Sequence, residues 1–150
     1  MLHEIKHPLL EHKLTALRDI RTGAKEFREL ASEITLLLAY EALKEVELEE
    51  RAIATPMAAM VGHRIRNDIV IVPVLRAGIG MLEGMLALVP NAKVGFVGMY
   101  RDHDTKRPVE YYCKLPENLR DPLAVIIDPM LATGGSLAAT VDLLRRKGIA

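Results

Sequence analysis

The sequence lacks several features that would place it in a specialised class. Its 150 residues include one cysteine, so no intrachain disulfide forms and we expect a reducing, cytoplasmic location. Twenty basic and twenty acidic residues give a formal net charge of zero, which argues against a nucleic-acid partner. The longest apolar runs, 69–75 and 123–127, are too short to span a bilayer, and the first residues have no apolar segment of a signal peptide. We therefore expect a soluble protein with no membrane partner.

The composition that remains is typical of one globular domain. Half of the residues are hydrophobic and 27% are charged, and 150 residues suffice for one packed core. Apolar residues at helical spacing predict helices within 9–20 and over 25–48. Thr55-Pro56 breaks the chain, and we expect a short helix around 57–62.

The pattern changes at residue 69. The sequence predicts strands at 69–75, 93–99, 109–114 and 123–128, of which the first and last are buried, with helices at about 79–88 and 136–147. Strands that alternate with helices favour an open, mostly parallel α/β sheet with right-handed crossovers. We therefore predict a single domain, 1–150, made of a helical arm (1–66) and an α/β core (67–150).

The last three residues follow a helix at the point where an α/β chain would begin another strand. Gly148 occupies the expected position of a helix C-cap, and Ile149 would suit the first residues of a strand. We interpret the sequence as truncated at its C-terminus. The alternative is a small domain whose last helix simply ends.

The segment VIIDPMLATGGS (125–136) combines a strand, an acidic residue, a short loop and a helix start. Gly134 and Gly135 allow backbone N–H groups to curl around an anion, and the helix N-terminus adds free donors and partial positive charge. Thr133 and Ser136 add hydroxyl donors, while Asp128 can accept hydrogen bonds from sugar hydroxyls. These groups suit a phosphate next to a ribose. A Walker P-loop would need a lysine after the glycines, which is missing; an ordinary capped turn is the other alternative.

A second strand-to-helix turn follows residues 69–75. A dinucleotide-binding fingerprint fits it poorly, because Glu83 stands at the third glycine position and Gly84 comes one residue late. Arg76 explains the turn better, since a guanidinium grips phosphate oxygens bidentately and ligands of open α/β sheets bind where strands end. Arg76 could also be an ordinary surface arginine.

These segments resemble a known family. VIIDPMLATGGS resembles the phosphoribosyl diphosphate (PRPP) signature of the type I phosphoribosyltransferases, and DPMLATGGS resembles uracil phosphoribosyltransferase in particular. Other similar segments follow in the same order along nearly the whole chain: HPLLEHKLTALRD (7–19), FRELASEI (27–34), LLAYEAL (37–43), PVLRAGIGMLEG (73–84), VGMYRD (97–102) and YYCKLP (111–116).

The resemblance implies a fold of the type I phosphoribosyltransferase kind and the reaction uracil + PRPP to UMP + diphosphate, in pyrimidine salvage. It implies Mg²⁺ bound mainly through PRPP, with no direct protein ligand. Loop 101–108 has few apolar residues, so we expect it to be mobile and able to close over the ligand. The resemblance also implies GTP as a candidate allosteric effector. We expect a homo-oligomer, dimeric or higher, because the exposed edge of the last strand carries unpaired N–H and C=O groups that favour self-association. The implied PRPP-binding residues are Arg76, Arg101, Asp128, Pro129, Met130, Leu131, Ala132, Thr133, Gly134, Gly135 and Ser136.

The resemblance leaves one part of the reaction without residues. In the family, uracil is recognised by a later glycine-rich segment of the type V-P-G-L-G-D-A-G, which these 150 residues do not contain. No general base or other catalytic residue is assigned. The alternative to an enzyme is a truncated module that binds PRPP or phosphate without turnover.

Overall fold

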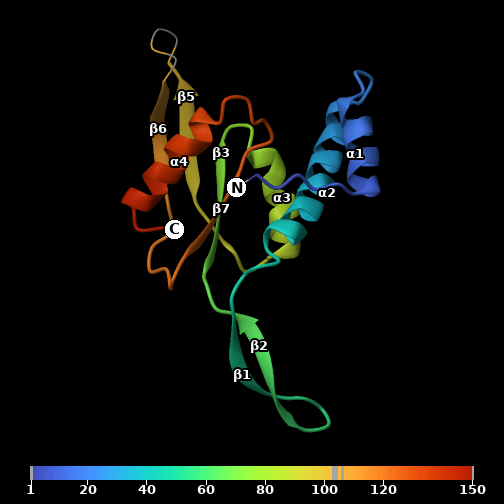
Figure 1. Ribbon diagram of the computed structural model, residues 1–150, viewed down its shortest axis with the longest axis vertical. Helices are drawn as coiled ribbons and strands as arrows, with labels where there is room; N and C mark the ends of the chain where they lie inside the picture. Colours follow the sequence, from blue (N-terminus) through green and yellow to red (C-terminus); the bar gives the residue numbers. More distant parts are fainter. Residues whose placement is uncertain (1, 103–104, 106, 150) are drawn as a thin grey trace.

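The fold is seen in a computed structural model that describes residues 2–102, 105 and 107–149 (Figure 1). Helices precede a β-hairpin, and an α/β unit follows it. The elements are α1 (Pro8–Arg18), α2 (Ala24–Ala42), β1 (Leu48–Ala54), β2 (Ala59–Ile65), β3 (Ile69–Leu75), α3 (Ile79–Leu88), β4 (Lys93–Val94), β5 (Phe96–Arg101), β6 (Pro108–Lys114), β7 (Leu123–Ile127) and α4 (Gly135–Arg146).

The main sheet is built around β3, which pairs in parallel with β7 along one edge and with β4 and β5 along the other. Strand β6 adds to β5 as an antiparallel neighbour. The predicted strand 93–99 is interrupted at Gly95, whose N–H donates to the Ile71 carbonyl and keeps β4 and β5 in line along β3. The predicted α/β fold with a mostly parallel sheet is therefore confirmed.

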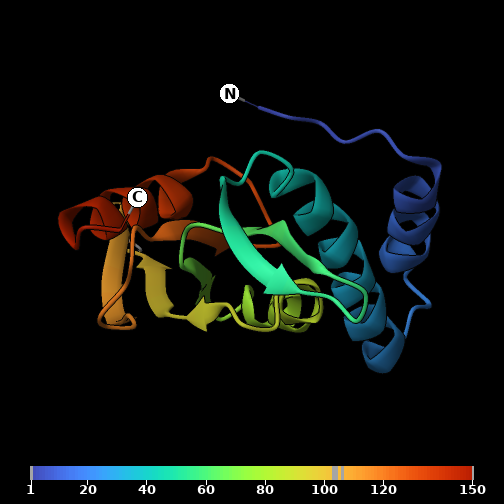
Figure 2. The ribbon, with the colours of Figure 1, turned by 90° about the horizontal axis from the view of Figure 1, so that it is seen from below.

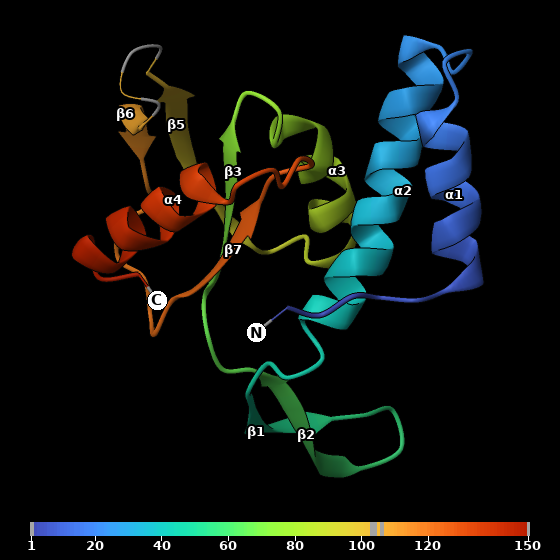
Figure 3. The same ribbon diagram turned by 45° about the horizontal axis from the view of Figure 1, so that its top comes forward.

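The two faces of this sheet are covered by different helices. Val70 and Val72 pack with Leu143 and Leu144 of α4 on one face, while Ile71 packs with Met85 of α3 on the other. Residues 69–74 are all buried, as expected for a central strand with helices on both sides. Figure 3 shows α4 on one side of the sheet and α3, α2 and α1 on the other.

The two N-terminal helices extend the α3 side. Pro8 begins α1 after His7, whose Nδ1 accepts the Leu9 N–H, a capping arrangement that suits a proline-initiated helix. Helix α1 packs on α2, and α2 packs on α3; Figure 2 shows α1 at the end of the molecule far from α4. Gly84 of α3 lies so close to the Ser32 carbonyl of α2 that a side chain there would clash, which explains why the helix contact requires glycine.

The predicted short helix at 57–62 is wrong, and so is the extension of α2 to residue 48. Strand β1 begins at Leu48 and pairs antiparallel with β2, in register from Leu48↔Ile65 to Ala54↔Ala59. The Thr55 hydroxyl accepts the Met57 and Ala58 N–H groups and donates to the Ala58 carbonyl. Thr55-Pro56 therefore breaks the chain as predicted, but it initiates a turn between strands rather than a helix. The region 1–66 is thus helical only in its first part.

The hairpin projects away from the rest of the molecule (Figure 1). Nearly every residue of both strands is exposed, Glu49 and Gly62 being the half-buried exceptions. Among the described residues, no helix combines the length and the apolar character needed to cross a membrane.

Candidate functional site

Two of the predicted site segments meet at one edge of the sheet. Strands β3 and β7 run parallel, and Pro73 lies opposite Ile127. The carboxyl ends of both strands therefore point to the same edge, so Arg76 and Asp128 follow neighbouring strands. Figures 1 and 3 both show the loop after β3 beside the loop after β7. This is the edge at which open α/β sheets bind ligands.

The loop after β7, residues 128–136, leads directly into α4. Asp128 is half-buried, and one of its carboxylate oxygens accepts the Met130 N–H at 3.2 Å, which holds the side chain at the start of the loop. Met130 and Leu131 are 78% and 64% exposed, so hydrophobic burial does not account for their place in the loop. Pro129, Ala132 and Thr133 are exposed as well.

Gly134 forms the N-cap of α4 in a left-handed conformation, with φ +74°. A side chain there would be strained, so the glycine is required by backbone conformation. In the described structure no side chain caps α4, which leaves the first-turn N–H groups available to an anion. Gly135 and Ser136 form the first turn of the helix, next to the exposed Thr133 hydroxyl.

The loop after β3 presents an arginine. Arg76 is exposed, and no ion pair to it is found in the described part of the chain. The peptide bond between Leu75 and Arg76 is cis. Arg76 is thus accessible at the carboxyl edge of the sheet, and its role in binding phosphate stays a prediction.

Sequence reasoning missed the importance of Gly78. Its N–H donates to the Val74 carbonyl at 2.9 Å, and an added Cβ would clash with the carbonyl oxygen of Ile127 at the end of β7. The signal in the sequence was a glycine three residues after a buried strand. By sequence alone this glycine fits only the first position of a dinucleotide fingerprint, because the neighbouring strand end cannot be identified from sequence.

The third predicted segment is only partly described. The backbone of Arg101 ends β5, opposite Pro108 of β6, while its side chain lies outside the described part of the structure. The Asp102 N–H donates to the Arg107 carbonyl, and its carboxylate accepts the Thr105 N–H. These bonds belong to the connection between two antiparallel strands. The role of Arg101 and the closing of loop 101–108 stay predictions.

Two carboxyl groups whose pKa is lowered, Asp68 and Glu49, lie away from this edge. Backbone hydrogen bonding from Arg120, followed by the Lys93 ammonium at 2.9 Å, lowers the pKa of Asp68, which precedes β3. Hydrogen bonds from Arg64 and then Arg120 lower the pKa of Glu49 in the hairpin. Both carboxylates sit in ion pairs at the amino end of the sheet, so they stabilise the fold rather than the candidate site.

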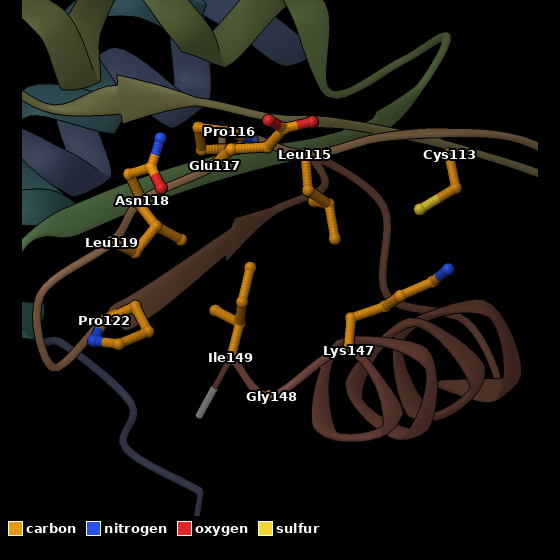
Figure 4. Close-up of a pocket in the computed structure, with 10 residues that line it drawn as sticks. All are labelled: Cys113, Leu115, Pro116, Glu117, Asn118, Leu119, Pro122, Lys147, Gly148 and Ile149. Carbon is orange, nitrogen blue, oxygen red and sulfur yellow. The ribbon is translucent and has the colours of Figure 1, made fainter.

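A separate hollow of about 480 Å³ lies between α4 and the connection from β6 to β7 (Figure 4). Leu115, Leu119 and Ile149 contribute its apolar lining. Cys113 borders it and packs against the core, and burial raises the pKa of this thiol. The thiol is therefore less ready to ionise than a free cysteine. The hollow is at the amino end of β7, remote from the loop that follows it.

Comparison with known proteins decides the family. The sequence model of uracil phosphoribosyltransferase matches residues 4–150. The chain belongs to the uracil phosphoribosyltransferase family. A uracil phosphoribosyltransferase of Desulfitobacterium hafniense is 49% identical over 148 residues, which cover 98% of this chain and 71% of the relative. A uracil phosphoribosyltransferase of Symbiobacterium thermophilum is 50% identical, with 96% of this chain and 69% of the relative covered. The remaining part of each relative has no counterpart among these 150 residues.

Solved structures share the fold of this chain. A protein structure from Aquifex aeolicus superposes with a TM-score of 0.90 at 41% identity, covering 99% of this chain and 72% of that chain. A purine phosphoribosyltransferase from Pyrococcus horikoshii superposes with a TM-score of 0.52 at 16% identity, covering 79% of this chain and 65% of that chain. The second likeness concerns the fold alone.

Proposed function

We propose that the protein binds PRPP at the edge formed by the ends of β3 and β7 and transfers the phosphoribosyl group to uracil. The bond from C1 of the ribose to the diphosphate oxygen breaks, a bond from C1 to uracil N1 forms, and N1 loses its proton; the products are UMP and diphosphate. One observation carries the proposal: an accessible arginine follows β3, and the uncapped, glycine-initiated helix α4 follows the neighbouring strand β7. The chain belongs to the uracil phosphoribosyltransferase family.

The proposed roles follow from the chemistry of each group. The N–H groups and hydroxyls of 130–136 hold the 5′-phosphate, because a helix N-terminus with free donors favours an anion. Asp128 accepts hydrogen bonds from the ribose hydroxyls, with one oxygen already oriented by the Met130 N–H. Arg76, together with Arg101 when its loop closes, stabilises the charge that develops on the departing diphosphate.

Magnesium fits this donor set only as a partner of the substrate. The described residues contain no cluster of three His, Cys, Asp or Glu side chains that could hold a metal ion. Asp128 alone offers a half-buried carboxylate in the loop after β7. Mg²⁺ commonly uses one or two carboxylates and completes its shell with phosphate oxygens and water. When bound, it would neutralise charge on the diphosphate.

A calorimetric titration tests PRPP binding. PRPP with Mg²⁺ is titrated into the wild type, Arg76→Ala and the control Arg51→Ala, which removes an exposed arginine from the hairpin. Loss of a charged hydrogen-bonding partner should weaken PRPP binding roughly 10-fold to 100-fold in Arg76→Ala and leave it unchanged in Arg51→Ala. A folded wild type that fails to bind PRPP would contradict the proposal.

The second candidate function is PRPP binding without turnover. It is favoured by the absence from these 150 residues of the glycine-rich segment that the family resemblance assigns to uracil. Labelled uracil added to the PRPP-loaded sample separates the two functions. Formation of UMP supports the enzyme, whereas PRPP binding without UMP supports the binding module.

The assembly and its regulation are part of the same proposal. The hairpin exposes apolar side chains, among them Met60 and Val61 at 50% and 56%, which supports a homo-oligomer. Light scattering with and without GTP measures the oligomeric state and any effect of this candidate effector. A strictly monomeric protein would contradict the oligomer. Cytoplasmic location stays a prediction.

A further inference from the structure

Gly78 is held where no larger residue fits. It is buried, and an added Cβ would lie 2.7 Å and 2.9 Å from the backbone N and O of Val74, and closer still to the carbonyl oxygen of Ile127. Its backbone has φ −60° and ψ −19°, an ordinary helical conformation that any residue adopts. The position therefore requires glycine for space and not for conformation.

This close contact joins the two loops of the candidate site. Gly78 comes two residues after Arg76 and begins the turn into α3. Ile127 is the last residue of β7, directly before Asp128. The contact is between backbone atoms of Ile127 and a glycine Cα, so neither side can adjust by rotating a side chain.

We propose that Gly78 is a positioning residue that sets the spacing between the loop 75–78 and the loop 128–136. The inference rests on the proposed function, in which one loop holds the diphosphate and the other the 5′-phosphate. Substitution by alanine would push the start of α3 away from the end of β7, and with it the arginine away from the phosphate loop. Protein interiors are close-packed, so such a displacement is transmitted rather than absorbed.

A change in the spacing of the two loops should affect a ligand that contacts both loops more than a ligand that contacts one. PRPP carries two anionic groups on one ribose, so its affinity depends on the distance between the two loops. Ribose 5-phosphate and inorganic pyrophosphate each need a single loop, and a change of spacing leaves each half-site intact. A purely structural role for Gly78 would not produce this division.

The test compares Gly78→Ala with Gly80→Ala, a control two residues along the same helix start, where an added Cβ meets nothing within 4 Å. Dissociation constants are measured for PRPP with Mg²⁺, ribose 5-phosphate and pyrophosphate, together with thermal unfolding. Gly78→Ala should weaken PRPP binding about 10-fold to 100-fold, the range that misplacement of about 1 Å produces. Binding of the two half-ligands should be unchanged, and Gly80→Ala should match the wild type throughout.

Two results would overturn the inference: unchanged PRPP binding in Gly78→Ala, or weakening of pyrophosphate binding as large as that of PRPP, which would place the effect of the added Cβ within the loop 75–78 through its clash with Val74. If the wild type itself does not bind PRPP, the proposed function is wrong and the inference falls with it. The two failures are therefore distinguished by the wild-type titration.

A second measurement covers the case in which Gly78→Ala does not fold. Hydrogen exchange of the wild type is recorded with and without inorganic pyrophosphate. Because the loops touch at Gly78 and Ile127, pyrophosphate at Arg76 should slow exchange in 128–136, and the effect should vanish in Arg76→Ala. Unchanged exchange in the wild type, or slowing that persists in Arg76→Ala, would show that the loops are not coupled.

Discussion

Strand β3 and the β1–β2 hairpin are adjacent in sequence but differ in what stabilises them. The first six residues of β3 are all buried, whereas the hairpin buries none of its strand residues. A two-stranded hairpin alone is only marginally stable in water. Contacts other than apolar burial must therefore stabilise it. Glu49 of β1 pairs with Arg64 and Arg120, and Glu47 pairs with Arg66. One region is stabilised by burial, the other by backbone pairing and ion pairs at its base.

Removing the same side chain from each region should give the largest contrast. Ile71→Ala empties a fully buried position in β3 and should cost about 2–5 kcal/mol of unfolding free energy. Ile53→Ala in the hairpin, where Ile53 is 41% exposed, should cost less than about 1 kcal/mol. Urea unfolding of both variants measures the difference. Equal losses would mean that the hairpin is as buried in the folded protein as β3 is.

Replacing a glycine by alanine in the helical packing and in the hairpin should give a smaller difference in stability. Gly84→Ala forces α3 against the backbone carbonyl of Ser32 in α2, and such overpacking should cost about 1–3 kcal/mol. In Gly62→Ala the new Cβ would meet the end of the Ile53 side chain at 3.2 Å, which can move away. Thermal unfolding of the pair checks this. A neutral Gly84→Ala would show that the α2–α3 contact adjusts freely.

Replacing valine by threonine keeps the shape and adds a hydroxyl. Val72 is fully buried, so the hydroxyl of Val72→Thr would lose its hydrogen bonds to water. The substitution should lower the free energy of unfolding by about 1–2 kcal/mol. At Val61, which is 56% exposed, it should stay within about 0.5 kcal/mol. A loss at Val61 that rises with protein concentration would reveal burial of the hairpin in an oligomer.

The smallest expected effect concerns the ion pairs at the hairpin base. The pKa of Glu49 lies below its ordinary 4.5 because of Arg64 and then Arg120. A lowered folded-state pKa contributes stability above the ordinary pKa, and this stability is lost as pH falls through the folded value. Glu49→Gln should therefore lower the melting temperature slightly at pH 7, and the difference from the wild type should disappear at acid pH, below the folded-state pKa.

The control for this variant is Glu50→Gln, because Glu50 is exposed and has no ion pair in the described part of the chain. It should follow the wild type at both pH values. A Glu49→Gln difference that persists at low pH would show that the side chain acts through packing rather than charge.

Most of the α/β unit was predictable because its residues obey local rules. Continuous β-branched runs such as 69–75 suit only a strand covered on both faces, and the helices α3 and α4 agree with prediction to within a residue. The hairpin was not predictable in this way. Its strands are neither buried nor regularly alternating, and cross-strand pairing between residues as far apart as Leu48 and Ile65 leaves no signal in a local window.

The candidate site likewise has features that the sequence determines and features that only the tertiary structure determines. The sequence by itself determined which chemical groups each loop carries: glycines and hydroxyls at a helix start after Asp128, and a guanidinium at Arg76. The structure added the φ of +74° that explains glycine at 134. Only the tertiary structure decided that the two loops lie side by side, because the pairing of β3 with β7 joins segments about fifty residues apart. Glycine is needed at 78 for space, since its backbone angles are ordinary: an added Cβ would clash with Val74 of the preceding strand and, because β3 pairs with β7, with the carbonyl of Ile127.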